Sequence, residues 1–368
     1  MTESEAWLAV SAAELPPRTV LELIDHYGSA EAVVAAGASG IAGVTKLTAH
    51  EAIRFSAAAE RNYEREHERL RRLGVRLVTI RDEEYPGNLR QIYDPSPVLF
   101  VRGSFLPCDE RAVAIVGTRR VTPYGRLVSE MLARGLAERQ ITVVSGMAVG
   151  ADAAAHRGAL AGGGRTIGVL ACGIDVPYPR DTLELREQAV EHGAVMCEVP
   201  PGTPARPQRF AARNRLISGL ALGVVITEAP EHSGALITAN AAANQGRQVF
   251  AVPGSINSEF SRGTHALLRD GARLVESVDD IIAELSLPEV AAPAPGQVTA
   301  AHEAPAAPRD LTSDESVILE ALSLQQRHVD QIIEDCRVPA NRASASLLML
   351  ELKGLVRRLP GNMFMRVR

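Results

Sequence analysis

The sequence predicts an α/β protein with a doubly wound, mostly parallel sheet, a small all-α domain before it and a winged helix after it. Between about residues 75 and 285, short β-branched runs alternate with amphipathic segments, as they do in βαβ units. Glycine-broken helical spacing precedes this region, and a Pro- and Ala-rich stretch follows it. We therefore expect domains at 1–72, 73–285 and 310–368, with an extended linker at 286–309.

Residues 1–72 are expected to form short helices joined by tight turns. Apolar residues recur at helical spacing and are interrupted by Gly28, Gly37, Gly40 and Gly43. The end of this region, 60–72, is dense in mixed charge, which is typical of an exposed helix. Helix pairs with glycine turns sometimes contact a DNA backbone, but a packing or interaction module fits the same pattern.

Eight β-branched runs are expected to be strands of the central sheet. They lie at 75–80, 98–101, 112–116, 141–144, 166–171, 195–198, 223–227 and 248–252. The segments between the later runs are amphipathic, and in one of them Leu127, Leu132 and Leu136 share a helix face. This alternation implies right-handed crossovers and a sheet that helices cover on both faces.

The last 59 residues predict a winged helix, because three helical segments come before two short strands. The helices are expected at 313–322, 328–336 and 343–354, and the strands lie about a Pro-Gly-Asn turn. From Leu352 to Arg368 there are five basic residues and no acidic one. Arg357 and Arg358 are therefore candidate secondary contacts to nucleic-acid phosphate, although many winged helices bind protein instead.

Composition and charge exclude several classes of protein. Among 368 residues, 39 Lys and Arg stand against 44 Asp and Glu, a net charge of −5. A wholly basic nucleic-acid-binding surface is thus excluded, but a local basic patch is not. No run approaches the roughly 18–20 apolar residues that span a bilayer, and the N-terminus lacks the pattern of a signal peptide. Four scattered cysteines without a CxxC pair indicate reduced thiols. We expect a cytoplasmic protein with no metal site and no membrane partner.

The loops that follow the predicted strands point to one binding edge. Ligands of open parallel sheets bind beyond the carboxyl ends of the strands, and these loops are rich in Gly, Ser, Thr, Arg and Asn. The segments 117–120 and 145–150 fit loops whose N–H groups approach a phosphate beside a helix N-terminus. A tight turn without a ligand fits them as well. Neither GxGxxG nor GK[ST] is present, so we expect no cofactor and no ATP hydrolysis.

Two arginine clusters free of carboxylates lie at this edge. The stretch from Val199 to Thr227 contains four arginines, and the stretch from Ala112 to Ser129 contains three. The planar fork of arginine suits phosphate. Phe210 lies within the first cluster, where an aromatic ring either stacks an unpaired base or anchors the loop as a buried residue.

No complete catalytic set is evident. Asp152 and His156 are four residues apart and share a helix face, a spacing that serves acid–base work or metal binding. A helix-capping Asp and a hydrogen-bonded His explain the same spacing. Because no nucleophile, base and orienting group are found together, we expect that the protein is not an enzyme.

Six segments follow one another in the central region: VAIVGTRRVTPYG, SGMAVGADAAAHRGAL, GVLACGIDVPYP, FAARNRLISGL, EAPEHSGALITANAA and GRQVFAVPGSINSEFSRGTHALLRDGA. Taken together, they resemble the DNA processing protein DprA (Smf) family. The resemblance implies an extended Rossmann-like domain between a sterile-alpha-motif-like or helix-hairpin-helix domain and a winged helix. It also implies a non-catalytic homodimer, formed through the Rossmann-like domain, that binds and protects single-stranded DNA. Such a protein loads RecA in place of the single-strand binding protein during natural transformation, with a role in repair left open.

The resemblance also implies site residues. Arg119 corresponds to a DNA-contacting arginine, Phe210 to the family's aromatic residue, and 213–215 to its RNR motif, while Thr118 stands where Ser is more usual. Arg165 occupies the place of a frequent lysine, and Arg209 aligns loosely as a further basic contact. The full predicted DNA site is Gly117, Thr118, Arg119, Arg120, Ser145, Gly146, Gly150, Arg165, Arg209, Phe210, Arg213, Asn214 and Arg215.

The alternative is an enzyme, a nucleoside monophosphate phosphoribohydrolase of the lysine-decarboxylase-like type, which uses a related sheet. That family carries PGGxGTxxE. Here the corresponding loop is HSGALITA, which lacks the double glycine and the terminal carboxylate. A transcription regulator that uses the winged helix is a third interpretation, and it would prefer a duplex site.

Overall fold

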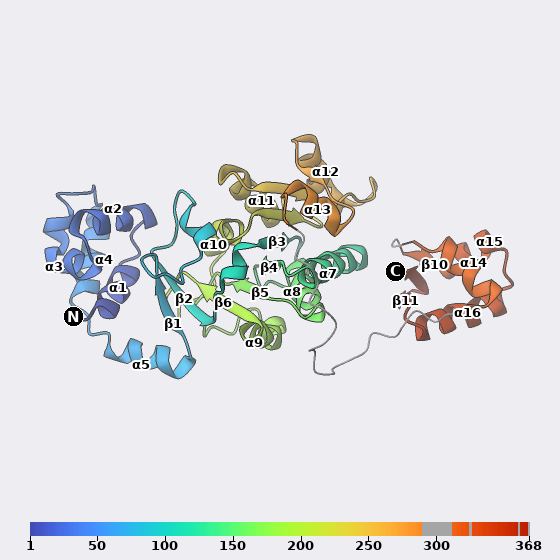
Figure 1. Ribbon diagram of the computed structural model, residues 1–368, viewed down its shortest axis with the longest axis horizontal. Coiled ribbons are helices and arrows are strands. Elements are labelled where there is room, and N and C mark those ends of the chain that lie inside the picture. The colour runs from blue at the N-terminus through green and yellow to red at the C-terminus, as the bar shows by residue number, and fades with distance from the viewer. Residues whose placement is uncertain (289–310, 324–325, 360, 367–368) are drawn as a thin grey trace. The chain divides into compact units, whose positions relative to one another are not determined.

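A computed structural model describes residues 1–288, 311–323, 326–359 and 361–366 (Figure 1). The chain divides into two compact units, and each is described by itself. One unit is Met1–Val121 with Val128–Val290, and the other is Thr122–Leu127 with Ala291–Arg368. Most of the predicted linker, 286–309, lies outside the described residues, and the four predicted domain ranges stay predictions.

The first residues fold into five short helices, and local capping signals mark where they begin and end. Thr2 and Thr48 form capping boxes with Glu5 and Glu51, and Gly28 closes a helix with φ of 87°. Trp7, Leu23, Ile24, Ile41 and Phe55 fill the core between the helices. The helices are α1 (Glu3–Ala12), α2 (Pro17–Tyr27), α3 (Ala30–Ile41), α4 (Ala49–Ala59) and α5 (Glu64–Leu73).

A nine-stranded sheet follows, and its order is β1-β2-β6-β5-β4-β3-β7-β8-β9. The first two strands are antiparallel additions, since β1 pairs with β2 and β2 with β6 in antiparallel register, while the other neighbours are parallel. The strands are β1 (Arg76–Thr79), β2 (Val98–Gly103), β3 (Ala112–Val116), β4 (Thr142–Ser145), β5 (Thr166–Val169), β6 (Gly193–Cys197), β7 (Gly223–Ile226), β8 (Gln248–Ala251) and β9 (Arg273–Leu274). The predicted fold class is confirmed. The two-residue β9 was not predicted, because it is too short to carry a periodic pattern.

Helices cover the sheet, and every residue of β3 to β7 is buried, as the β-branched runs predict for a sheet with two covered faces. The covering helices are α7 (Pro123–Glu138), α8 (Ala151–Ala161), α9 (Leu183–Glu191), α10 (Pro207–Leu220), α11 (Gly234–Asn244), α12 (Arg262–Arg269) and α13 (Val278–Glu284). Short turns lie at α6 (Gly87–Arg90), η1 (Pro107–Glu110), η2 (Arg180–Thr182) and η3 (Glu259–Ser261).

The strand order reverses at β3, which pairs with β4 on one side and with β7 on the other. The chain builds β3 to β6 in one direction and then returns to add β7 to β9 beyond β3. A doubly wound sheet has its ligand crevice at such a switch point. The topology therefore places the candidate site between the loops that follow β3, β4 and β7.

The second unit contains the winged helix. Its helices are α14 (Ser313–Ala321), α15 (Val329–Cys336) and α16 (Ala340–Leu352), and its strands β10 (Arg327–His328), β11 (Val356–Leu359) and β12 (Met363–Arg366) pair in the order β10-β12-β11. Ile318, Ile332, Leu347 and Phe364 form its core. Arg357 and Arg358 are exposed on β11. Within the described residues, no helix is both long enough and apolar enough to cross a membrane.

Candidate nucleic-acid interface

A cleft of about 340 Å³ lies at the switch point, as the strand order leads us to expect. It is lined by the loop after β3, the start of α8, the middle of α10 and the start of α11. The residues that line it include Gly117, Thr118, Arg119, Asp152, Phe210, Arg213, Asn214, His232, Ser233 and Thr238. Six of the predicted site residues thus meet in one cleft.

The glycines of the rim allow segments of the protein itself to pack closely. A Cβ on Gly117 would lie 2.7 Å from the Ala151 Cβ and 3.0 Å from the Glu228 carbonyl oxygen. A Cβ on Gly150, where φ is +88°, would lie 2.5 Å from the Thr118 carbonyl oxygen. The Thr118 N–H donates to the Glu228 carbonyl at 2.8 Å. This N–H already has a hydrogen-bond partner inside the protein and is not available to a phosphate. The prediction that the N–H groups of 117–120 approach a phosphate is therefore wrong for Thr118.

Arg119 and Phe210 form the exposed part of the site. The Arg119 guanidinium carbon lies 4.6 Å from the centre of the Phe210 ring, a cation–π contact. Arg119 and Arg120 are both exposed and Phe210 is half-buried. The Tyr178 ring lies edge-to-face against Phe210, with ring centres 5.9 Å apart. Phe210 is therefore neither free nor a fully buried anchor, because cationic and aromatic neighbours hold its ring at the surface.

Several predicted contacts lie beneath this surface. Ser145 is buried, and its hydroxyl donates to the Ile115 carbonyl at 2.6 Å. Arg213 is 4% exposed and donates to the carbonyls of Gly146 and Val169. Burial lowers the Arg213 pKa to about 10, so the guanidinium remains charged at neutral pH. In the free protein these groups hold the strand ends together and do not face solvent.

The rest of α10 is tied to other elements. Asn214 donates to the Gly234 carbonyl at 3.2 Å and so joins α10 to the start of α11. Arg215 forms ion pairs with Glu198 at 2.5 Å and Asp94 at 3.1 Å. Burial raises the pKa of Glu198, and the Arg215 charge opposes that rise. The stretch from Val199 to Thr227 contains no carboxylate, but the fold brings carboxylates from outside that stretch against its arginines.

Arg209 points away from the cleft and toward the helical region, where it pairs with Glu14 at 3.2 Å. Both residues line a second cavity of about 460 Å³, between α1, α2 and the sheet rim. Phe210 and Arg209 are adjacent in sequence, so the helix turns their side chains toward different neighbours. The structure does not bring Arg209 into the cleft with Arg119.

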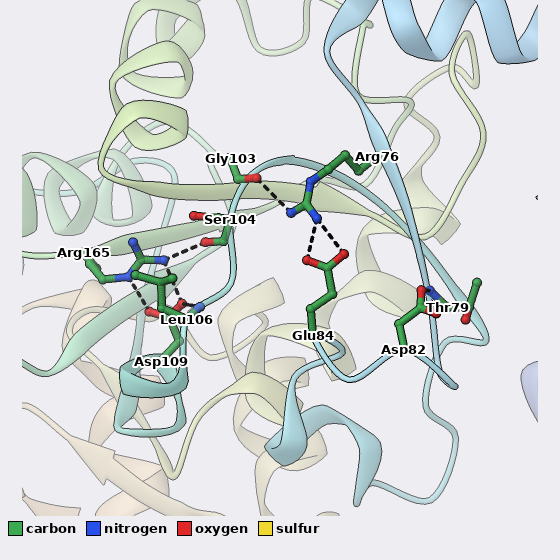
Figure 2. A network of polar contacts seen from close by, with 9 residues as sticks. All are labelled: Arg76, Thr79, Asp82, Glu84, Gly103, Ser104, Leu106, Asp109 and Arg165. Carbon is green, nitrogen blue, oxygen red and sulfur yellow. Dashed lines mark hydrogen bonds and ion pairs between the residues drawn. The ribbon is translucent and has the colours of Figure 1, made fainter.

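Arg165 lies at the opposite edge of the sheet, because it precedes β5 while the rim lies beyond the strand ends. It forms two 2.8 Å bonds with buried Asp109 and a third bond, of 2.6 Å, to the Ser104 carbonyl (Figure 2). The hydrogen bonds that Arg165 donates to the Asp109 carboxylate raise the Arg165 pKa. Arg165 is thus not brought together with the other predicted residues, and a role in DNA contact stays a prediction for a separate surface.

Asp152 and His156 are both buried and hydrogen-bonded within the protein. His156 is fully buried, its Nδ1 lies 2.7 Å from the Thr166 hydroxyl, and burial lowers its pKa to about 3. It is therefore neutral. Asp152 lies beneath the rim beside Arg213 and accepts a hydrogen bond from the Ala148 N–H at 3.4 Å. The two residues do not form an acid–base pair that faces the cleft.

The sequence prediction missed Tyr178, His232 and Ser233. His232 and Ser233 line the cleft, and Tyr178 contacts Phe210. All three lie in loops that follow strands. Their place in the sequence predicted that these loops form the rim, but not which of their side chains turn toward the cleft. Only the packing of neighbouring loops selects those side chains.

Comparisons with known proteins identify the family of the chain. The family described as DNA recombination-mediator protein A matches residues 76–286, and the DprA winged helix domain matches residues 302–362. Protein Smf of Escherichia coli is 32% identical over 333 residues, which is 88% of this chain and 86% of that protein. DNA processing protein DprA of Bacillus subtilis is 41% identical over 216 residues, 58% of this chain and 73% of that protein.

Two solved structures are similar as well. That of DNA processing protein A from Streptococcus pneumoniae has a TM-score of 0.69 and 32% identity, and the match covers 77% of this chain and 98% of that one. That of DNA processing protein A from Helicobacter pylori, solved for its single-stranded DNA binding mode, has a TM-score of 0.52 and 31% identity, over 57% and 96% of the two chains. Because the family model covers more than half of the chain and the Escherichia coli relative is 32% identical over 86% of its own length, the chain belongs to the DNA processing protein A (DprA/Smf) family.

Proposed function

We propose that this protein binds single-stranded DNA at the rim of the sheet and acts there as a recombination mediator without catalysis. The observation that carries the proposal is the contact between Arg119 and Phe210 at the mouth of the cleft. A phosphate-binding guanidinium beside an aromatic ring is the pairing that unpaired nucleic acid requires. The single-stranded DNA binding mode of the Helicobacter pylori relative supports the choice of ligand.

The charges of the cleft support a phosphate ligand. Among the described residues, neither Arg119 nor Arg120 pairs with a carboxylate, and both are exposed. Buried Arg213 adds a fixed positive charge directly beneath them. The nearby Asp152 is also buried, so an approaching phosphate meets the arginines first. Binding of this kind is weakly sequence-selective and sensitive to salt.

Family membership supports the wider role. We propose that the protein protects incoming single-stranded DNA and loads RecA onto it in place of the single-strand binding protein, in transformation and in repair. We also propose a homodimer formed through the Rossmann-like domain, and a cytoplasmic location. RecA-dependent strand exchange on DNA coated with single-strand binding protein tests the loading step, which we expect to accelerate when this protein is added.

Fluorescence anisotropy with oligo-dT and an equally long duplex, over a salt series, tests the DNA-binding step. We expect tight binding of oligo-dT, weaker binding of duplex, and loss of most oligo-dT affinity in Arg119→Ala. Arg72→Ala is the matched control, because it removes one exposed arginine from α5, outside the cleft.

Two results would overturn the proposal. If wild type bound neither DNA, the site would have another ligand, and cleavage of nucleoside monophosphates would be the next assay. If wild type preferred duplex and Arg119→Ala left binding unchanged, the DNA-binding surface would lie elsewhere in the chain.

A further inference from the structure

Tyr178 presents an exposed aromatic ring beside Phe210. It lies on the loop that follows β5 and remains 39% exposed. Its ring meets Phe210 edge-to-face, with an interplanar angle of 64° and centres 5.9 Å apart. A cavity of about 40 Å³ is lined by this pair together with Arg119 and Cys172. The loops after β3 and β5 and the first turn of α10 thus contribute Arg119, Tyr178 and Phe210 to one cluster.

Arg186, on α9, holds the Tyr178 loop from beneath. Its guanidinium is buried and donates to three carbonyl oxygens of that loop, those of Ile174 at 3.3 Å, Val176 at 3.0 Å and Tyr178 at 2.7 Å. Among the described residues no carboxylate forms an ion pair with it. A buried guanidinium without a carboxylate is costly unless its donors are satisfied. Here the loop backbone accepts from both terminal nitrogens, while the buried Nε has no hydrogen-bond partner among the described residues.

A second anchor fixes the far end of the same loop. The Thr182 hydroxyl donates to the Met147 carbonyl at 3.0 Å and so ties the start of α9 to the loop after β4. Thr182 itself is 1% exposed. With both ends held, the loop presents the Tyr178 ring in one place. A ring that is ordered before binding spends little conformational entropy when a ligand stacks on it.

We propose that Tyr178 is a second base-stacking residue of this interface and that Arg186 is its positioning residue. The proposal rests on the proposed binding of single-stranded DNA. An exposed, preordered ring next to Phe210 stacks a neighbouring base, and the guanidinium of Arg186 sets where that ring stands.

The spacing of the two rings makes the pair selective for unpaired strands. Their centres are 5.9 Å apart, whereas neighbouring bases of a duplex strand rise by only about 3.4 Å. The rings are also far from parallel. Bases that stack on both rings must be splayed apart, which an unpaired strand permits and a base-paired one resists.

Oligo-dT and an abasic oligomer of equal length test the role of Tyr178, because the abasic chain keeps the phosphates and lacks the bases. The full-length chain is used as wild type, Tyr178→Ala and Tyr178→Phe. We expect Tyr178→Ala to bind oligo-dT about tenfold more weakly and the abasic oligomer as wild type does. Tyr178→Phe keeps the ring and should match wild type on both.

Two outcomes would overturn the stacking role. Tyr178→Ala that binds oligo-dT like wild type shows that the ring makes no contact. Tyr178→Ala that loses affinity equally on the abasic oligomer shows that the ring only shapes the loop. Failure of the proposed function would look different. Wild type itself would then not bind oligo-dT, and Arg119→Ala would show no loss of affinity.

Arg186→Met tests the positioning role. We expect it to weaken oligo-dT binding toward the level of Tyr178→Ala and to spare the abasic oligomer. The double variant should then be no weaker than Tyr178→Ala alone, because both changes remove the same contact. Arg186→Lys, which keeps the charge without the planar fork, is the second variant if Arg186→Met does not fold. Losses that add in the double variant would overturn this part of the proposal.

Discussion

The guanidinium of Arg119 lies over the ring of Phe210, 4.6 Å from its centre, although Arg119 belongs to the loop after β3 and Phe210 to the first turn of α10. The contact occupies one face of the ring in the free protein. A base that stacks on Phe210 must therefore use the other face or displace Arg119 toward a phosphate. Phosphate binding by Arg119 and base stacking on Phe210 are therefore coupled.

Phe210→Ala should separate these two kinds of binding. We expect oligo-dT affinity to fall by about 1–3 kcal/mol, the usual value for the loss of one stacked base. The salt dependence should not change, because no phosphate contact is lost. Arg119→Ala should instead lower the slope of log K against log salt by about 0.7 for each lost phosphate contact.

A salt series by fluorescence anisotropy measures both quantities in each variant. Phe210→Tyr is the control, because it retains an aromatic face. Equal salt slopes for wild type and Arg119→Ala would contradict the assignment of Arg119 to phosphate.

Glu14→Gln should release Arg209 from its ion pair with the helical region. The Glu14 side chain is 55% exposed and that of Arg209 is 22% exposed, so the pair itself contributes little to folding. We expect oligo-dT affinity to rise by at most about fivefold, as Arg209 becomes available to phosphate. Glu60→Gln removes the same charge from an exposed position at the end of α4 and should have no such effect. If both variants respond alike, the cause is net charge and not Arg209.

Arg165→Ala should destabilise the fold without affecting the rim. The change leaves Asp109, which is 8% exposed, without its guanidinium partner. Because Thr142 and Leu106 still donate to that carboxylate, we expect a loss near the low end of the range for a broken buried pair, about 3 kcal/mol. Urea unfolding measures this loss. Oligo-dT binding by the folded protein should remain as in wild type, and a loss as large as that of Arg119→Ala would place Arg165 in the DNA interface after all.

His156 should make stability depend on pH. Its folded pKa, about 3, is below the ordinary value of 6.5 because the ring is buried. Below pH 6.5 the unfolded chain binds a proton that the folded chain does not, so stability falls as the pH is lowered from 6.5 toward 3. Between pH 6.5 and 5 this amounts to roughly 1.5 kcal/mol.

Urea unfolding of wild type and His156→Gln over that range measures the effect. Glutamine keeps a hydrogen-bonding group near Thr166 but does not titrate, so its curve should be flatter. Parallel curves for the two proteins would show that His156 is not the group responsible.

Arg357→Ala with Arg358→Ala tests the predicted secondary contacts of the winged helix. Both residues are exposed on β11, and Arg358 is held by the Asn362 side chain at 2.9 Å. We expect a smaller loss of DNA affinity than in Arg119→Ala, with a salt slope lowered by at most about 1.4 for two phosphates on a single strand. Unchanged affinity for both oligo-dT and duplex would remove the wing from the DNA interface.

The sequence by itself determined the layers of the protein and the edge at which to look for a site. Eight β-branched runs became strands because a sheet covered on both faces needs continuous apolar segments, a local property of the chain. The binding edge followed because the carboxyl ends of parallel strands share one side of the sheet. Even the distance of Arg165 from this edge was implicit in its position directly before a strand.

Only the tertiary structure decided which arginines face solvent. Along the chain, Arg209, Arg213 and Arg215 form one acid-free cluster, yet in space each has a different partner. Glu14, 195 residues away from Arg209, and Glu198, just before the acid-free stretch, neutralise two of them. The carbonyls of Gly146 and Val169, at the ends of β4 and β5, enclose the third. A helix sends neighbouring residues in different directions, and the partner that each side chain meets depends on how distant segments pack. The electrostatics of the rim is therefore a property of the fold, and no stretch of sequence contains it.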